Sequence, residues 1–249
     1  MKGKLYVVGI GPGGREQMTL EAVRCIEESE VIVGYHLYLR LIEGMLAGKT
    51  VISAGMTEEI GRVRAALEMA EAGYTVSLVS SGDPGIYGLA GLVFQVAGDS
   101  NLEIRVVPGV SALSSCSAVL GAPLMNDFVC ISLSDMLTPM EKIEERIEAA
   151  ARADFVVVVY NPKGSRFEHN LERFREIMLR HRPPDTPVGI VRKAYREGEE
   201  RVITTLADML SHRIDMVTTI IVGNSNTFVS GGRMVTPRGY ENKYRIERA

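Results

Sequence analysis

The first 110 residues alternate between strand-like and helix-like patterns of hydrophobic and polar positions. Apolar runs rich in β-branched residues lie at residues 5–10, 31–33, 50–52, 75–79 and 103–107. Helical patterns occur between some of these runs, at residues 19–28 and 57–72. Strands that alternate with helices are typical of a mostly parallel sheet whose strands are joined by crossover helices. We therefore expect an α/β domain in this part of the chain.

The helical pattern at residues 57–72 also predicts which side chains face the core. Four apolar residues recur there at helical spacing, namely Ile60, Val63, Leu67 and Ala70. This spacing places them on one face of a helix. Charged residues surround that face, namely Glu58, Arg62, Arg64 and Glu68. We expect the apolar set to be buried and the charged set to lie around it.

The second half has a different order of elements. Strands are predicted at residues 128–133, 155–160, 188–192, 200–204 and 217–222, and helices at 111–120, 140–152 and 167–181. Residues 196–200 form a tight polar connection, which predicts a hairpin and therefore a mixed sheet. The whole pattern predicts a two-domain α/β protein. We place the domains at residues 1–112 and 113–249, with a ligand cleft between them.

Two glycine-rich turns follow predicted strands of the first half. Gly9-Ile10-Gly11-Pro12-Gly13-Gly14 closes the first apolar run, and SSGDPGIYG at residues 80–88 follows the fourth. Such compositions cannot continue a strand or lie inside a helix, so each must be a turn at the carboxyl end of its strand. Ligands bind at that edge of open parallel sheets. The two turns therefore predict one shared ligand site.

The composition and net charge of the chain indicate which kinds of molecule it is expected to bind. The chain of 249 residues has 24% charged residues, 46% hydrophobic residues and a net charge of −3, which is ordinary for a soluble globular protein. No basic excess favours nucleic acid and no apolar run is long enough for a membrane span, so we expect neither partner. The first residues show no signal-peptide pattern. These features favour a cytoplasmic protein.

The cysteines and histidines do not indicate a metal centre. Cys25, Cys116 and Cys130 are odd in number and form no C-x-x-C motif, and the histidines are scattered. This pattern is not that of a disulfide framework or of a zinc site. We expect reduced, packed thiols and no protein-bound metal.

The first glycine turn also satisfies G-x-G-x-x-G, through Gly9, Gly11 and Gly14, so a dinucleotide must be considered. Two details count against it. Pro12 lacks the backbone N–H that a pyrophosphate would use. In addition, the second predicted strand ends in Gly34-Tyr35, whereas a ribose-binding acid is expected there. An NAD-dependent dehydrogenase stays an alternative from a different enzyme class.

Seven motifs in order resemble the tetrapyrrole (corrin/porphyrin) methylase family, whose members use S-adenosylmethionine (SAM) to methylate precursors of sirohaem and cobalamin. They are GIGPGG (9–14), SSGDPGIYG (80–88), VPGVSA (107–112), ISLSD (131–135), YNP (160–162), VGNS (222–225) and TPRGY (236–240). SLSDMLTP, YNP, GNSNT and TPRGY resemble the branch that acts at C17 of precorrin-3B or cobalt-factor III. The resemblance implies the two-domain fold of that family, a tetrapyrrole substrate and a homodimer.

The resemblance also implies which residues bind SAM. In the turns of the first half these are Pro12, Ser81, Gly82, Asp83, Ile86, Ser111 and Ala112. Asn161 and Ala194, at the ends of later strands, match positions that flank the adenine. We expect SAM to be the methyl donor, so that the protein needs neither a nucleophile nor a metal of its own.

Methylation in the C17 branch accompanies contraction of the macrocycle, a step that moves a hydroxyl proton. Asp135 and His36 are the candidates for that role. Thr138-Pro139 reads as the start of the next helix, which leaves Asp135 available to a ligand. Cations expected to orient the substrate carboxylates are Arg192, Lys193, Arg196 and Arg238. Action at another ring position, or a non-catalytic corrinoid-binding module, remain alternatives.

Overall fold

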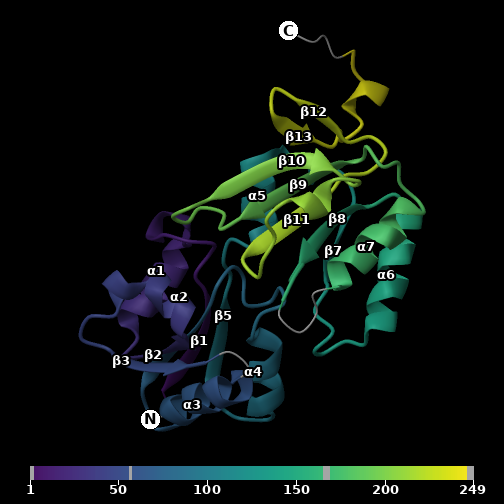
Figure 1. Cartoon of the computed structure of the whole chain (residues 1–249). Coiled ribbons are helices and arrows are strands. Elements are labelled where there is room, and N and C mark those ends of the chain that lie inside the picture. The colour runs from purple at the N-terminus through teal and green to yellow at the C-terminus, as the bar shows by residue number, and fades with distance from the viewer. Residues whose placement is uncertain (1–2, 56–57, 165–168, 246–249) are drawn as a thin grey trace. The chain divides into compact units, whose positions relative to one another are not determined.

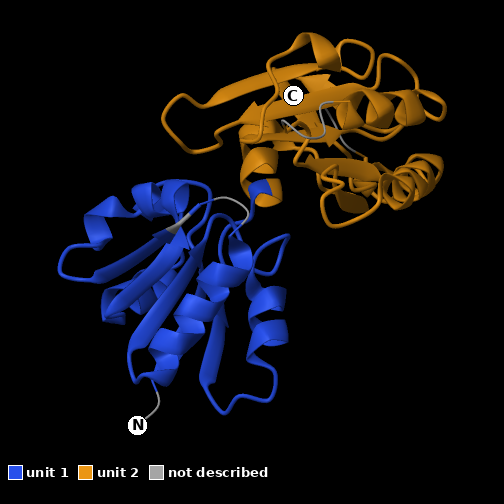
Figure 2. Cartoon of the chain, turned by 60° about the horizontal axis from the view of Figure 1, so that its bottom comes forward, with its two compact units in different colours: residues 1–112 blue, residues 113–249 orange. Residues whose placement is uncertain are grey.

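The computed structural model describes residues 3–55, 58–164 and 169–245 of the chain (Figure 1). The described residues form two compact units, residues 1–112 and 113–249 (Figure 2). Each unit has its own five-stranded sheet, with a buried core on each face of that sheet.

Unit 1 is built on a five-stranded sheet in the order β3-β2-β4-β1-β5. Its strands are β1 (Lys4–Gly9), β2 (Val31–Tyr35), β3 (Thr50–Ala54), β4 (Thr75–Ser80) and β5 (Glu103–Val107). Every neighbouring pair is parallel. The carboxyl ends of all five strands therefore meet at one edge of the sheet, as the alternating pattern predicts.

Helices cover both faces of this sheet (Figure 1). They are α1 (Leu20–Glu28), α2 (His36–Leu41), α3 (Glu59–Glu71) and α4 (Ala90–Ala97). Leu5 and Val7 of β1 belong to the core beneath α3 and α4, whereas Tyr6 and Val8 belong to the core beneath α1 and α2. Successive residues of a strand point to opposite faces, so one apolar run serves both cores. The sequence pattern did not predict α2 and α4.

Helix α3 buries a different face from the expected one. Val63, Leu67 and Ala70 are buried as predicted, but Ile60 is 53% exposed and Arg62 only 5% exposed. The prediction for these two residues was wrong. The Arg62 guanidinium folds back and donates hydrogen bonds to the Gly55 carbonyl oxygen after β3 and to the Glu59 carboxylate, which buries it. The expected start at Thr57 lies outside the described residues.

Unit 2 contains a five-stranded sheet in the order β10-β9-β11-β8-β7. Its strands are β7 (Phe128–Ser132), β8 (Val156–Tyr160), β9 (Pro187–Arg192), β10 (Glu200–Thr205) and β11 (Thr218–Val222). Only β7 and β8 pair in parallel, and the predicted hairpin joins β9 to β10. The sheet is therefore mixed, and the carboxyl ends of β7, β8 and β9 share one edge.

Two layers enclose the unit 2 sheet. Helices α6 (Met140–Arg152) and α7 (Asn170–Leu179) cover one face. Helix α5 (Ala112–Leu120) and β13 (Arg233–Val235) pack on the other. Strand β13 pairs with β12 (Phe228–Ser230) and β6 (Gly121–Ala122) in a small sheet that the sequence pattern did not predict. Helix α6 starts at Met140 as predicted, but its N-cap is Pro139, one residue later than the predicted cap Thr138.

Short 3-10 helices complete the described chain at Arg15–Gln17, Glu43–Met45, Met209–Ser211 and Tyr240–Asn242. None of the helices in the described residues is long and apolar enough to cross a bilayer.

The cysteines are reduced thiols within the cores. Burial raises the pKa of Cys116 to about 11 and that of Cys130 to about 12. Because the thiolate is the reactive form, we predict that neither residue reacts with iodoacetamide at pH 8 in the folded protein. Peptide mapping with and without denaturant measures this. A triple cysteine-to-alanine variant that folds should keep its activity, and complete loss of turnover in it would reveal a catalytic thiol.

Candidate functional site

The two glycine turns of unit 1 are joined by backbone hydrogen bonds. The Gly11 N–H donates to the Gly82 carbonyl oxygen at 3.2 Å, and the Gly82 N–H donates to the Gly11 oxygen at 2.8 Å. Gly11 follows β1 and Gly82 follows β4, which are neighbouring strands. Both glycines have a positive φ, +69° and +66°, which other L-residues rarely adopt. The turns predicted from the sequence therefore meet in one place.

A third turn, after β5, closes against the other two. A Cβ built on Gly109 would lie 2.1 Å from the Gly82 oxygen and 2.8 Å from the Gly9 carbonyl carbon. A Cβ on Gly9 would in turn lie 2.7 Å from the Gly109 nitrogen. Real Cβ atoms do not approach backbone so closely, so only glycine fits at these two positions. The ends of β1, β4 and β5 together form a single cradle of backbone.

Asp83 holds this cradle together. One carboxylate oxygen accepts the Gly85 N–H at 2.8 Å, within its own turn, and the other accepts the Gly109 N–H at 3.0 Å, from the turn after β5. Hydrogen bonds from backbone amides to a carboxylate are charge-assisted and strong. Asp83 therefore fixes both the shape of the β4 turn and its distance from the β5 turn. A direct contact between Asp83 and SAM stays a prediction.

The remaining residues predicted to bind SAM in unit 1 lie on or beside the cradle. Pro12 and Ser111 are buried, Ser81 and Ala112 are half-buried, and Ile86 is 36% exposed. A Cβ on Gly82 would meet nothing closer than the Ala112 nitrogen at 3.7 Å. The cradle is thus open at this point while it is closed at Gly109. It offers backbone polar groups and no cluster of fixed charges, which fits a cofactor held by shape and backbone hydrogen bonds.

In unit 2, unusual backbone conformations gather at the carboxyl edge of the sheet. Asn161, Lys193 and Tyr195 have φ angles of 49°, 53° and 57°. Asn161 follows β8, and the other two flank the buried Ala194 after β9. The Asn161 amide donates a hydrogen bond to the Ser132 hydroxyl oxygen at 2.8 Å. Such strained positions concentrate at binding sites, which favours the predicted roles of Asn161 and Ala194 without testing them.

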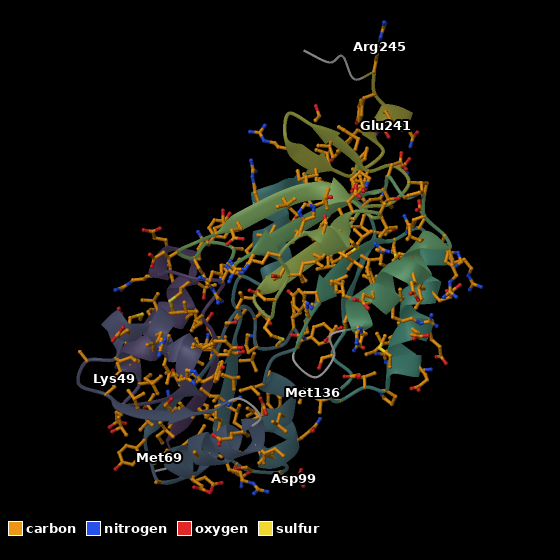
Figure 3. All side chains as sticks on the ribbon, viewed as in Figure 1. Lys49, Met69, Asp99, Met136, Glu241 and Arg245 are labelled. Carbon is orange, nitrogen blue, oxygen red and sulfur yellow. The ribbon has the colours of Figure 1, made fainter. Side chains whose placement is uncertain are left out.

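The two candidate proton carriers lie in different units. His36 is exposed at the first position of α2 in unit 1. Asp135 is exposed in the loop after β7 in unit 2, next to Met136, which is 49% exposed and labelled in Figure 3. Both side chains are accessible to a ligand.

Arg192 is not a free cation, in contrast to the expectation from sequence. Its guanidinium is within 2.7 Å of Asp215 and 3.3 Å of Glu200. Burial alone would raise the pKa of Asp215, but hydrogen bonds from Arg192, Val217 and Thr218 outweigh it and hold that pKa below its usual value. The positive charge of Arg192 is therefore balanced by carboxylates of the protein itself. Lys193 reaches the carbonyl oxygen of Glu197 at 3.4 Å.

The GNSNT and TPRGY motifs lie at the opposite edge of the unit 2 sheet. The Thr227 and Thr236 hydroxyls are 2.8 Å apart, and Thr227 also accepts the Asn224 N–H at 2.9 Å. All three residues are buried. Because β11 runs antiparallel to β8 and β9, these residues lie beyond the amino ends of those strands. The structure shows a packing role for them, in which they fix the β12–β13 hairpin.

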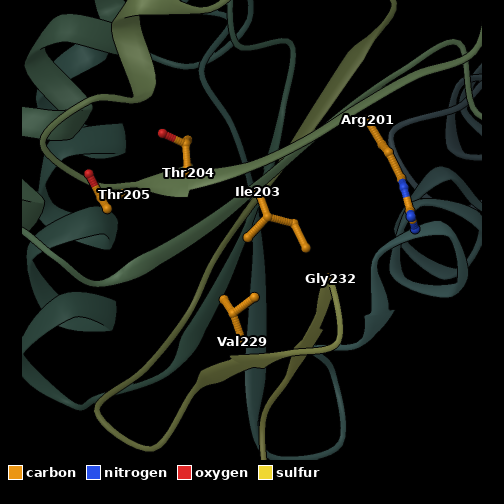
Figure 4. A pocket seen from close by; sticks show the side chains of 6 residues that line it. All are labelled: Arg201, Ile203, Thr204, Thr205, Val229 and Gly232. Carbon is orange, nitrogen blue, oxygen red and sulfur yellow. The ribbon is translucent and has the colours of Figure 1, made fainter.

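A cavity of about 480 Å³ lies between β10 and this hairpin. Its lining residues are Arg201, Ile203, Thr204, Thr205, Val229 and Gly232 (Figure 4). No sequence motif pointed to it, because its lining is brought together by the hairpin and carries no distinctive residue type.

The sequence profile of the tetrapyrrole (corrin/porphyrin) methylases matches residues 4–210, which include all three turns of the cradle. The chain belongs to the tetrapyrrole methylases. Two features of the structure also count against the NAD alternative. The turn leads into a 3-10 helix at Arg15–Gln17, and β2 ends in Tyr35 with no acid.

Two curated relatives are similar to this tetrapyrrole methylase over nearly its whole length. A cobalt-factor III methyltransferase of Priestia megaterium is 52% identical over 99% of the chain, and the match covers 47% of that protein. A probable cobalt-factor III C(17)-methyltransferase of Salmonella typhimurium is 47% identical over 95% of the chain and is covered to 99%. The chain thus spans about half of the first relative and nearly all of the second.

Solved structures show the same fold. The methyltransferase CobJ aligns with a TM-score of 0.89 and 34% identity, over 94% of this chain and 100% of CobJ. A uroporphyrin-III C-methyltransferase from Thermus thermophilus, crystallised with S-adenosyl homocysteine, aligns with a TM-score of 0.71 and 26% identity, over 89% of this chain and 97% of that one.

Proposed function

We propose that this tetrapyrrole methylase transfers a methyl group from SAM to C17 of cobalt-factor III, with ring contraction, in cobalamin biosynthesis. The cradle of backbone at the ends of β1, β4 and β5 is the observation that carries the proposal. The name of the relative at 47% identity supports C17, and the names of both relatives, at 52% and 47% identity, favour the cobalt-containing substrate. Metal-free precorrin-3B is the close alternative substrate.

The residues of unit 1 fit SAM as a cofactor. When bound, SAM supplies an activated methyl group on a sulfonium, so the chain need not provide a nucleophile. The chain's own task is to hold the cofactor rigidly and to exclude water. Asp83, Gly9 and Gly109 fix the cradle, while Pro12 and Ser111 line it as buried neighbours. Accurate positioning of two reactants can lower a barrier by about 7–11 kcal/mol.

Exposure and charge indicate which residues act on the macrocycle that accepts the methyl group. Asp135 or His36 moves the hydroxyl proton during ring contraction, since both are exposed. Arg192 is committed to Asp215 and Glu200, so we do not propose it as a cation for substrate carboxylates. Asp135 lies in unit 2, outside the SAM turns. We therefore expect Asp135→Asn to impair turnover more than SAM affinity.

Calorimetry with SAM, its demethylated product and NAD tests the cofactor assignment. We expect SAM and the product to bind with a Kd on the order of 1 μM, about −8 kcal/mol, and NAD not to bind. Binding of NAD without SAM would instead support the dehydrogenase alternative. A protein that binds the macrocycle but neither SAM nor its product would be a non-catalytic corrinoid-binding module.

We also propose a homodimer that works in the cytoplasm. Strand β10 forms an edge of the unit 2 sheet, and an open edge must be covered or paired. The neighbouring hairpin exposes Phe228 (41%) and Val229 (48%). Sedimentation velocity at micromolar concentration should show a dimer, and Val229→Glu should shift it toward monomer. A wild-type protein that sediments only as a monomer would contradict the proposal.

A further inference from the structure

Part of the carboxyl edge of the unit 1 sheet is not used by the cofactor turns. Those turns follow β4, β1 and β5, whereas β2 and β3 extend the sheet beyond β4. The register pairs Gly34 with Val79, so the next residue, Tyr35, stands level with Ser80. Adjacent strands are about 4.8 Å apart. Tyr35 therefore lies one strand away from the turn that begins at Ser81.

Aromatic rings gather at this end of β2. The Tyr35 ring meets the His36 ring at a centroid distance of 4.4 Å and an interplanar angle of 60°. The Tyr38 ring contacts Tyr35 edge-on at 5.2 Å and 85°. Tyr35 and Tyr38 are half-buried, whereas His36 is exposed. The cluster thus presents ring surface at the same edge as the cofactor cradle.

A buried arginine supports the cluster from α3. The Arg62 guanidinium carbon lies 5.9 Å from the Tyr35 ring centroid, and the side chain is 5% exposed. Arg62 donates to the Gly55 carbonyl oxygen after β3 and to the Glu59 carboxylate at 3.2 Å. Its Nε is buried and has no hydrogen-bond partner among the described residues. Glu59 balances the charge of Arg62, and Arg62 is almost fully buried. Arg62 therefore orients Tyr35 and does not bind a carboxylate of the substrate.

We propose that the rings of Tyr35, His36 and Tyr38 are the contact surface for the flat, conjugated macrocycle that accepts the methyl group, and that Arg62 is a positioning residue for them. This inference rests on the proposed function. The acceptor carbon must approach the donated methyl to about 3–3.5 Å, so the acceptor must lie beside the cradle. Strand β5 is the edge of the sheet on one side, which leaves β2 as the flanking strand. Aromatic faces pack favourably on a conjugated ring.

The test measures macrocycle binding and cofactor binding separately. Titration of cobalt-factor III is followed by its visible absorbance without SAM, and SAM binding by calorimetry. We expect Tyr35→Leu and Arg62→Met to raise the Kd and KM for the macrocycle about tenfold, with kcat changed less and the Kd for SAM unchanged. Tyr35→Phe keeps the ring and should retain wild-type binding. Tyr74→Leu is the matched control, because Tyr74 is 43% exposed and precedes β4 at the opposite edge.

Wild-type macrocycle affinity in folded Tyr35→Leu overturns the inference, even if Arg62→Met fails to fold. An equal loss for Tyr35→Phe also overturns it, because the ring itself would then not be the contact. If the wild-type protein binds SAM but no tetrapyrrole, the proposed function fails, and this inference fails with it. If the wild-type protein binds both SAM and the tetrapyrrole, and the Tyr35→Leu and Arg62→Met variants bind the tetrapyrrole equally well, the inference fails while the proposed function stands.

Discussion

Replacement of Gly109 by alanine is expected to abolish detectable SAM binding and to destabilise unit 1. The new Cβ would lie 2.1 Å from the Gly82 carbonyl oxygen, which is backbone and cannot rotate away. Either the β5 turn or the β4 turn must move, and that breaks the cradle. Overpacking of this kind costs about 3 kcal/mol. Calorimetry with SAM and urea unfolding measure the two effects.

Gly91→Ala is the matched control for this substitution. Gly91 lies in α4 of the same unit, and a Cβ there would meet nothing within 4 Å. Alanine is favoured over glycine inside a helix by about 1 kcal/mol, so this variant should be at least as stable as the wild type and bind SAM normally. Normal SAM affinity in Gly109→Ala would show that the three turns do not form the cofactor site.

Substitution of Asp83 is expected to have the second largest effect. The carboxylate accepts the N–H groups of Gly85 and Gly109. Asp83→Ala leaves both donors without this partner. The Gly85 donor is exposed and can bond to water, whereas loss of the partner of the part-buried Gly109 donor costs about 1–3 kcal/mol. Asp83→Asn keeps one acceptor oxygen but turns an NH2 group toward the other donor. We expect SAM affinity to fall about 100-fold in the alanine variant and less in the asparagine variant.

Asp99→Asn provides the matched control for charge. Asp99 is exposed in the loop after α4 and is labelled in Figure 3. Its substitution removes the same charge from unit 1 without touching the cradle, so SAM affinity should not change. Should Asp83→Ala bind SAM as tightly as Asp99→Asn, the role given to the Asp83 carboxylate would be wrong.

The sequence predicted those parts of the fold whose signal is local. Helix α6 begins and ends as its apolar spacing predicts, and the glycine turns lie where their compositions break the strands. Strands β2 and β3 each run two residues beyond the prediction, because Gly34 and Tyr35 pair with Ser53 and Ala54. Pairing between strands far apart in sequence is not visible in either strand alone.

The same limit applies to charged side chains. Arg62 and Arg192 have the sequence surroundings of exposed residues, yet both are buried. Their partners come from other elements: Gly55 and the Tyr35 ring for Arg62, and Asp215 for Arg192. A single sequence does not show which acceptor folds back onto which arginine. The sequence motifs therefore located the cradle. Which groups pair with each arginine could be seen only in the structure.

The most direct test of the proposed reaction uses SAM carrying a 13C-labelled methyl group. The protein is incubated with cobalt-factor III, with precorrin-3B and, separately, with uroporphyrinogen III, and the products are analysed by mass spectrometry and NMR. We predict one labelled methyl at C17 of the cobalt-factor III product, with a contracted ring. Labelling of uroporphyrinogen III with no activity on either later precursor would contradict the C17 assignment and show that the enzyme acts at a different ring position.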